Sequence, residues 1–421
     1  MSILLQGLQL KGAEIISHNG KRADISVSID SIDYFEDILS PCTTMAIKCN
    51  SSNRIVNSLP IRGGEKVVMK LSVPTGEFDA DGVRGFYVKK VADYAADGQK
   101  ETFVLQCISR EGITNETTRC ERKYQKLTID QHVTSILKDV LKTKNYKTEN
   151  IEKTSNTYSF IGNQKKPFHI LSWLCPKGIP IAGKSGTSGS EAKGVAGYFF
   201  YENQDGFNFK SVENLIGGIG ESKIAAAYSY SGVIEHNKIG QESKILDYKM
   251  NRNVDFQQSL RVGMYSNVTF FFDLYENKTE YYQYNLKDEI AGKLGGQGKI
   301  EVAEGFENSP TRILVRTSDR GILDPNTIAG DSGRDTADMA KSFARYNLLF
   351  TQSINMAVPC NINLKVGDVI TAEFPRVSSS DKTDKDPEQS GKYLIKSLRH
   401  HFEANANITY MSLIRDSYGL Y

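Results

Sequence analysis

Short segments of the chain alternate polar and apolar residues, and this period of two predicts β-strands with one buried face. Residues 23–29 (Ala-Asp-Ile-Ser-Val-Ser-Ile) and residues 44–49 show the alternation near the N-terminus, and residues 267–275 form the clearest strand of a later region. Glycine and aspartate between the segments predict antiparallel hairpins. Because an open sheet must close or cover its edges, we expect small barrels or sandwiches.

One β-module occurs twice, once near each end of the chain. Each copy has a Gly-acid turn before a strand, then Gly-x-Tyr-aliphatic-x-Lys, then a last strand that ends in arginine. The matching segments are Gly64-Glu65, residues 85–90 and Arg110 in the first copy, and Gly367-Asp368, residues 391–396 and Arg415 in the second. Self-similarity of this kind indicates related structural units. We therefore predict two superimposable antiparallel β-barrels, with Tyr87 and Tyr393 on equivalent strands.

Helical spacing interrupts the strand pattern in three places. Thr128 can cap a helix whose apolar residues recur on one face. Pro167 begins a shorter helix. Strands are predicted at 179–182 and 198–201, separated by a Gly/Ser-rich loop, and a third helix is predicted at 335–350.

These segments predict a mainly β protein with α+β insertions, made of two similar antiparallel β-barrel domains and two smaller accessory domains. The predicted boundaries are 1–120 for the first barrel, 121–222 for an α+β domain, 223–255 together with 340–421 for the second barrel, and 256–339 for a small inserted domain.

The composition narrows the class of protein. The chain has 421 residues and a formal net charge of +2, with acidic and basic residues interspersed, so nothing indicates specific nucleic-acid binding. The six cysteines contain no Cys-x-x-Cys pair, which predicts reduced thiols in a protein made in a cytoplasm. Residues 1–7 do not resemble a signal peptide, and no apolar run approaches the roughly 20 residues of a membrane span. We expect no membrane insertion and a release by lysis or within an assembly.

Residues 178–185, Gly-Ile-Pro-Ile-Ala-Gly-Lys-Ser, match the phosphate-binding pattern G-x-x-x-x-G-K-S. That pattern needs a strand before the loop and a helix after it, so that backbone amides surround the phosphates. Here a helix is predicted before Gly178, Pro180 removes one amide, and the residues after Ser185 favour a loop. We therefore interpret the segment as a strand running into a flexible loop and predict no nucleotide site.

No other pattern marks catalytic, cofactor-binding or metal-binding residues, and none is predicted. His400 and His401 are adjacent, so on a strand they point to opposite faces and do not chelate one metal. The charged loop 378–390 contains four acidic residues but lacks the spacing of a calcium loop, and we expect it to be exposed. A pair of catalytic carboxylates is a spatial arrangement that the sequence leaves open. The chain is predicted not to be an enzyme.

The order of the segments resembles the baseplate central hub protein of contractile-tail bacteriophages, which is related to the hub part of type VI secretion spikes. The shared order is a β-module, then a helix-and-strand unit around residues 168–175, then a second β-module interrupted by an inserted domain. The most specific stretch is Ala-Arg-Tyr-Asn at 344–347, a strand at 353–356 and Leu-Lys-Val-Gly-Asp-Val-Ile at 364–370. Val366 stands where the family often has proline.

The resemblance implies a homotrimer in which each subunit offers two tail-tube-like barrels, so that three chains match a hexameric tail tube and hold a central spike at the other end. The implied partners are the tail tube protein, the central spike protein and neighbouring baseplate wedge proteins. The implied location is the virion tail baseplate, after assembly in the host bacterial cytoplasm. No catalytic residue carries over.

Two other classes of function stay open. One is a carbohydrate-binding or receptor-binding β-protein of a virion, which should cluster exposed aromatic side chains on one surface. The other is an enzyme, either nucleotide-dependent through Gly183-Lys184-Ser185 or a cell-wall hydrolase. The sequence does not distinguish a phage from a tailocin or a secretion system, nor does it show whether the spike is a separate chain.

Overall fold

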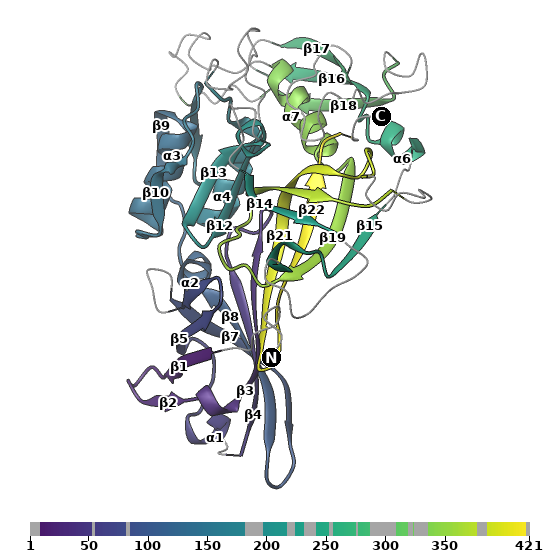
Figure 1. Cartoon of the computed structure of the whole chain (residues 1–421). Helices are drawn as coiled ribbons and strands as arrows, with labels where there is room; N and C mark the ends of the chain where they lie inside the picture. Colours follow the sequence, from purple (N-terminus) through teal and green to yellow (C-terminus); the bar gives the residue numbers. More distant parts are fainter. Residues whose placement is uncertain are drawn as a thin grey trace.

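The computed structural model describes residues 9–52, 55–80, 85–181, 197–216, 224–230, 241–251, 256–274, 277–286, 309–318, 323, 336–376 and 385–417. The fold is mainly β, as predicted, and most of its strands belong to one sheet of 14 strands. Figure 1 shows the long strands of this sheet in the middle of the molecule, with helices on one side and a smaller sheet at one end.

The large sheet contains the same path of strands twice. The strands of the first half are β1 (Gln9–Ile16), β2 (Arg22–Asp24), β3 (Ile29–Asp37), β4 (Thr44–Ser51), β5 (Lys66–Val73), β6 (Gly76–Asp79), β7 (Phe86–Ala96) and β8 (Glu101–Ser109). Those of the second half are β14 (Ile224–Ser229), β15 (Asp247–Asn251), β19 (Gln352–Pro359), β20 (Val369–Glu373), β21 (Gly391–Glu403) and β22 (Asn407–Arg415). The neighbours in space are β3-β4-β8-β7-β5-β1 and β15-β19-β22-β21-β20-β14. Taken in chain order, each strand of one path has a counterpart in the other.

The repeated Gly-acid turn has the same backbone hydrogen bonds in both halves. Gly64 donates its N–H to the carbonyl of Val88 at 2.7 Å, and Val88 donates to Glu65 at 2.9 Å. In the second half, Gly367 donates to Ile395 at 3.1 Å and Ile395 donates to Asp368 at 2.9 Å. Val88 is therefore the counterpart of Ile395.

This register shifts the sequence alignment of the module by one residue. Tyr87 lies on β7 and Tyr393 on β21, which are counterpart strands. The residue that takes the place of Tyr393, however, is Phe86, and both of these side chains are buried. The two paths also differ in the relative direction of one strand pair, because β1 is antiparallel to β5 whereas its counterpart β14 is parallel to β20. The two barrels and the domain boundaries stay predictions.

Strand β21 pairs with different strands at its two ends. Its first residues, 391–394, pair with β20, and residues 397–403 pair antiparallel with β3 of the first half. Lys396 lies at the irregularity between them, where the pairing with β22 also shifts. The two halves therefore share one continuous sheet through a contact, here called the β21–β3 seam, which the sequence did not predict.

Each half packs its own hydrophobic core against the sheet. The first core includes Ile32 of β3 and Phe86 of β7, and the second includes Met356 of β19 and Tyr393 of β21. The alternation that predicted strands also set these faces, since every second residue points inward. The helices beside the first half are α1 (Ile55–Ser58) and α2 (Arg110–Thr117).

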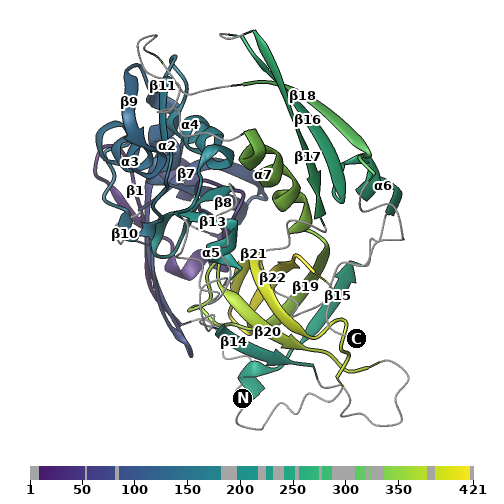
Figure 2. The same ribbon diagram turned by 90° about the horizontal axis from the view of Figure 1, so that it is seen from above.

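A separate α+β unit with its own core packs against both halves (Figure 2). Its elements are β9 (Lys123–Thr128), α3 (Ile129–Ser135), β10 (Tyr146–Ile151), β11 (Thr157–Ile161), α4 (Pro167–Leu174), β12 (Tyr198–Asn203), β13 (Gly206–Ser211) and α5 (Val212–Leu215). Thr128 and Gln131 form a capping box at α3, which continues as a π-helical segment, 136–140. The strand predicted at 179–182 was wrong over its described part, where Pro180 makes only an isolated bridge to Thr154.

The inserted segment forms a three-stranded sheet that packs on a helix. The elements are α6 (Phe256–Arg261), β16 (Ser266–Asp273), β17 (Lys278–Asn285), β18 (Arg312–Thr317) and α7 (Thr336–Leu348), which ends two residues earlier than predicted. In the charged loop 378–390, residues 378–384 lie outside the described residues; Lys385 and Pro387 are exposed as expected, whereas two other residues are not. Asp386 and Gln389 are buried there, and Arg415 donates to the carbonyl of Ser390 at 3.2 Å.

Gly367 gives a test of the conformation and packing of the second Gly-acid turn. Gly367 has φ +91°, and a Cβ added there would clash with the Tyr201 hydroxyl, whereas Gly98 has no atom within 4 Å of such a Cβ. We expect Gly367→Ala to lower the free energy of unfolding by at least about 2 kcal/mol, because it adds backbone strain to a steric clash. Gly98→Ala, the control, should stay within about 0.5 kcal/mol of the wild type. Equal urea-denaturation midpoints for the two variants would contradict this account.

Candidate assembly surfaces

The phosphate-binding look-alike lacks the structural context of a nucleotide site where it is described. The 3₁₀ helix Cys175–Lys177 follows α4 directly and leads into Gly178, so a helix rather than a strand precedes the loop. Gly178 also lies against the Tyr198 ring. Gly183, Lys184 and Ser185 lie outside the described residues. The helix before Gly178 therefore agrees with the interpretation from sequence, whereas the strand expected at 179–182 is not formed over its described part.

The histidines and acidic residues do not gather into a metal site in the described part of the chain. His400 is fully buried, while His401 faces the other side of the sheet and lies 2.7 Å from Asp33. All six cysteines are unpaired; Cys42 is half-buried and the others are buried. Among the described residues, no helix is both long enough and apolar enough to cross a membrane.

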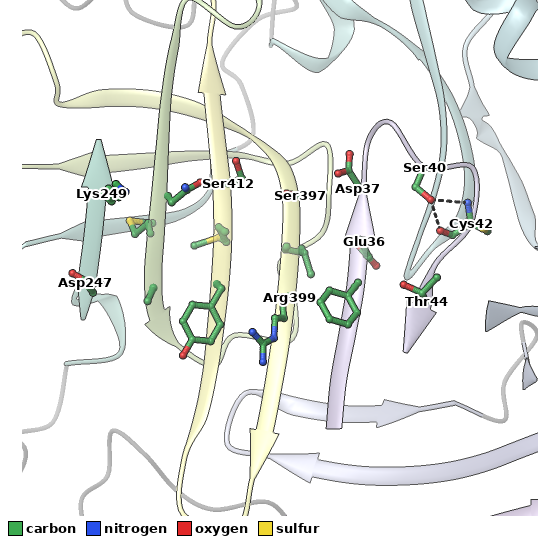
Figure 3. A pocket seen from close by; sticks show the side chains of 17 residues that line it. Glu36, Asp37, Ser40, Cys42, Thr44, Asp247, Lys249, Ser397, Arg399 and Ser412 are labelled. Carbon is green, nitrogen blue, oxygen red and sulfur yellow. Dashed lines mark hydrogen bonds between the residues drawn. The ribbon is translucent and has the colours of Figure 1, made fainter. Parts of the chain in front are cut away.

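A hollow of about 450 Å³ lies on the sheet where the two halves meet (Figure 3). Its lining comes from six neighbouring strands, β15, β19, β22, β21, β3 and β4, and from the turn between β3 and β4, so it extends across the β21–β3 seam. Most of the lining side chains, such as Lys249, Asn355 and Tyr410, are on the face of the sheet that points away from the two cores. The sheet is therefore concave on its outer face, and it carries charges of both signs there.

Ion pairs cross the seam on this outer face. The Arg399 guanidinium lies 2.7 Å from Asp33, and the Lys396 ammonium lies 3.4 Å from Asp37. All four side chains are partly exposed, so each pair adds little stability. The pairs instead favour one register between the two strands, because the acidic residues are on β3 and the basic residues are on β21.

Two buried carboxylates act on the inner side: one joins the two halves and the other joins the α+β unit to the first half. Glu36 of β3 accepts the backbone N–H of Val366 at 2.9 Å, and Glu202 of β12 accepts that of Thr43 at 2.8 Å. Asn145 donates to the other oxygen of Glu202 at 2.8 Å. Because a buried carboxylate without donors would be very costly, these bonds hold the turns against the sheet in one arrangement.

A buried ion network joins the α+β unit to the C-terminal strand. Arg345 of α7 lies 2.6 Å from Glu213 of α5 and 2.9 Å from Asp416, next to the end of β22. Burial raises the pKa of Glu213, while the arginine opposes that rise. Arg345 belongs to the stretch that carried the family resemblance, and its role here is structural.

Strands β7 and β15 each have one open edge in the described structure. The pairing of β7 with β5 ends at Val88, and residues 89–96 pair only with β8. β15 pairs with β19 and with no other described strand. Such edges offer free backbone donors and acceptors to another strand.

The outer face of the inserted sheet is apolar and exposed. Tyr281 is 72% exposed, Ile313 68% and Val315 66%. The register places Tyr281, Phe270 and Val315 side by side across the three strands. Sugar sites combine aromatic rings with several converging polar groups, and here Gln283 is the only amide in the described cross-strand rows next to these residues. An exposed apolar face of this kind marks an interaction surface.

The fold is similar to those of known tail proteins. A tail protein from Neisseria meningitidis MC58 matches with a TM-score of 0.52 and 9% identity, covering 97% of this chain and 97% of that one. The 43 kDa tail protein of prophage MuSo2 from Shewanella oneidensis matches with a TM-score of 0.52 and 9% identity, covering 96% and 98%. The chain shares its fold with these tail proteins. No family model and no curated protein matches the sequence.

This shared fold confirms the resemblance found in the sequence at the level of architecture. The alignments cover nearly the whole of each chain. The seam, the hollow and the open edges are features that sequence reasoning missed. The repeated Gly-acid turns were the only signal in the sequence from which these three features could have been predicted.

His400 should make the fold sensitive to acid. Burial lowers the pKa of His400 to about 4, and its ring lies 2.9 Å from the Thr409 hydroxyl. In the unfolded chain this histidine binds a proton at about pH 6.5, whereas in the folded chain it does so only near pH 4. The free energy of unfolding should therefore fall by up to about 3 kcal/mol as the pH drops from about 6.5 to 4. Below pH 4 the contribution of His400 should not change further. Buried carboxyls with raised pKa values, such as Glu152, act in the opposite direction.

The comparison of His400→Asn with the wild type isolates this contribution. Asparagine keeps a polar group near Thr409 but does not titrate. Urea denaturation at several pH values should show a smaller loss of stability in the variant between pH 6.5 and 4. Parallel curves for the two proteins would assign the acid sensitivity to other groups.

The look-alike loop should not bind nucleotide. We expect calorimetry with ATP and magnesium to give no binding heat at millimolar concentrations, because Gly178 follows a helix and Pro180 offers no amide. Lys184→Ala should have the thermal stability of the wild type. ATP binding that disappears in this variant would show that the loop forms a phosphate site despite its context.

Proposed function

We propose that the chain is the structural hub of a contractile-tail baseplate, a homotrimer that adapts a hexameric tail tube to a trimeric central spike. The observation that carries this proposal is the strand path that occurs twice in one chain. Three chains with two similar halves supply six similar units, which is what a six-fold tube requires of a three-fold adaptor. The fold shared with tail proteins supports the same assignment.

In this proposal each half forms a tail-tube-like barrel. The first barrel corresponds to 1–120 and the second to 223–255 with 340–421, while 121–222 and 256–339 are accessory domains. The concave outer face of the shared sheet supports a ring, because a sheet that curves around a space outside its own core can form part of a channel wall. The hollow carries charges of both signs, which fits the wall of a channel through which material moves without being bound.

The proposed partners are the tail tube protein, the central spike protein and neighbouring wedge proteins. The protein would act in the virion baseplate after assembly in the bacterial cytoplasm. Its work is mechanical, and the proposal assigns it no catalytic residue, cofactor or metal. The face of β16, β17 and β18 carries the exposed aromatic side chains Tyr281 and Phe272, the feature expected of the carbohydrate-binding alternative, whereas the helix before Gly178 weakens the nucleotide-dependent one.

The oligomeric state tests the proposal. Native mass spectrometry and sedimentation at micromolar concentration should give three times the 46.9 kDa chain mass. Negative-stain averages viewed along the axis should show six similar lobes around a central opening. A species that is monomeric under all salt conditions, or a trimer with three lobes and no opening, would contradict the ring. A peptidoglycan-release assay on the same sample should show no activity above buffer.

A further inference from the structure

The open edge of β7 begins at the point where its pairing with β5 ends. Val88 completes the pairing with β5, and Lys89 lies at an irregularity of the pairing with β8. From Lys89 to Ala96 the strand is half-buried or exposed, with Tyr94 48% exposed. A strand this long that is paired on one side only is a template for another chain.

The open edge of β15 has the complementary geometry. Its residues pair with β19 from Asp247 to Asn251, and Asp247 and Lys249 are exposed. Tyr248 and Met250 alternate with them and pack on the second core. The strand is therefore fixed in position by its core face, while its other edge is free of described strands.

The counterparts of these two strands pair with each other inside the chain. β7 corresponds to β21 and β15 corresponds to β3, and β21 pairs with β3 along 397–403 and 31–37. The correspondence extends to details, since Lys89 and Lys396 lie at the same irregularity immediately after the turn contact. One chain thus contains one complete seam and the two unpaired sides of a second seam.

We infer that β7 of one copy of this chain pairs antiparallel with β15 of the next copy, repeating the β21–β3 seam between subunits. The inference rests on the proposed trimer and specifies its contact. Superposing the two paths, with Asp93 as the extra residue of β7, places Ala95 opposite Lys249 and Ala96 opposite Tyr248. Three such contacts leave no β7 or β15 edge open and close the ring.

Charge sets which edges pair. In the internal seam Asp33 of β3 meets Arg399 of β21. At the position of this pair the signs are reversed on the open edges, because Lys249 takes the place of Asp33 and Asp93 directly follows Ala92, the counterpart of Arg399. Lys89, the counterpart of Lys396, keeps its sign. A second half that paired with another second half would bring Lys249 to Arg399, a like-charge contact that disfavours this arrangement. The charges therefore favour alternation of first and second halves.

A proline on the edge tests the inference. After the irregularity at Lys89, the N–H of Val91 faces the same side as that of Val88, which donates to Glu65. Val91→Pro removes this donor while the pairing with β8 remains, so the chain should keep the far-UV circular dichroism spectrum of the wild type but sediment as a monomer. Val91→Thr, the matched control, keeps the N–H and a similar volume and should form trimers.

A cysteine pair gives an independent readout. Ala95→Cys with Lys249→Cys should form disulfides between subunits under mild oxidation and give dimers and trimers on non-reducing gels. Ala95→Cys with Lys278→Cys, which places the second thiol on the inserted sheet, should not. The six native cysteines are half-buried or buried and provide the background.

The outcomes separate this inference from the function on which it rests. A trimeric wild type whose Val91→Pro variant is a folded monomer, with crosslinks specific to the Ala95 and Lys249 pair, supports both. A trimeric wild type whose proline variant remains trimeric and whose cysteine pair does not crosslink overturns the edge pairing and leaves the hub standing. A wild type that never forms trimers overturns both.

Discussion

The antiparallel ladder between β21 and β3 is the contact on which the rest of the structure depends. β21 closes the second half through β20 and then, beyond Lys396, provides the edge on which β3 pairs. An irregularity that changes the direction of a strand is what allows one strand to have two successive neighbours on the same side. Because the ladder is continuous, the two cores share one wall and cannot move independently without breaking backbone hydrogen bonds.

Buried charges reinforce this arrangement without being a large source of stability. Glu36 and Glu202 are each removed from water, and hydrogen bonds from donors in another segment of the chain replace those to water. Arg345 holds Glu213 and Asp416 in the same way. Replacing such groups by apolar ones is often nearly neutral, so their value is in excluding alternative packings. Here they fix the α+β unit against both halves, and the outer curvature of the sheet is fixed with it.

Local signals were readable from the sequence because their causes are local. Alternation identified the strands, Thr128 identified the start of a helix, and the pairs Gly64-Glu65 and Gly367-Asp368 identified turns, which have the same hydrogen bonds in the structure. The alignment of Tyr87 with Tyr393 was off by one residue, because the shared tyrosine was a weaker guide than the backbone bonds of Val88 and Ile395.

Long-range contacts were not readable in this way. Nothing in residues 31–37 shows that they pair with residues 397–403, since their alternation is satisfied by any antiparallel neighbour. The strand at 179–182 was predicted from apolar composition, whereas Pro180 cannot donate to a ladder and makes a single bridge. The open edges became visible only after the two paths were superposed.

The duplicated path also limits the kinds of assembly that the chain can form. An unlike contact between two halves applies a fixed rotation, and repeating it gives a closed ring or an open helix. The internal seam already fixes the rotation between the first half and the second. A contact between subunits that repeats the seam must continue the same rotation, so the curvature of the hollow in one chain is also the curvature of the assembly. In the proposed ring, the reversed charges at Lys249 and Asp93 keep the seam between subunits distinct from the seam within one chain.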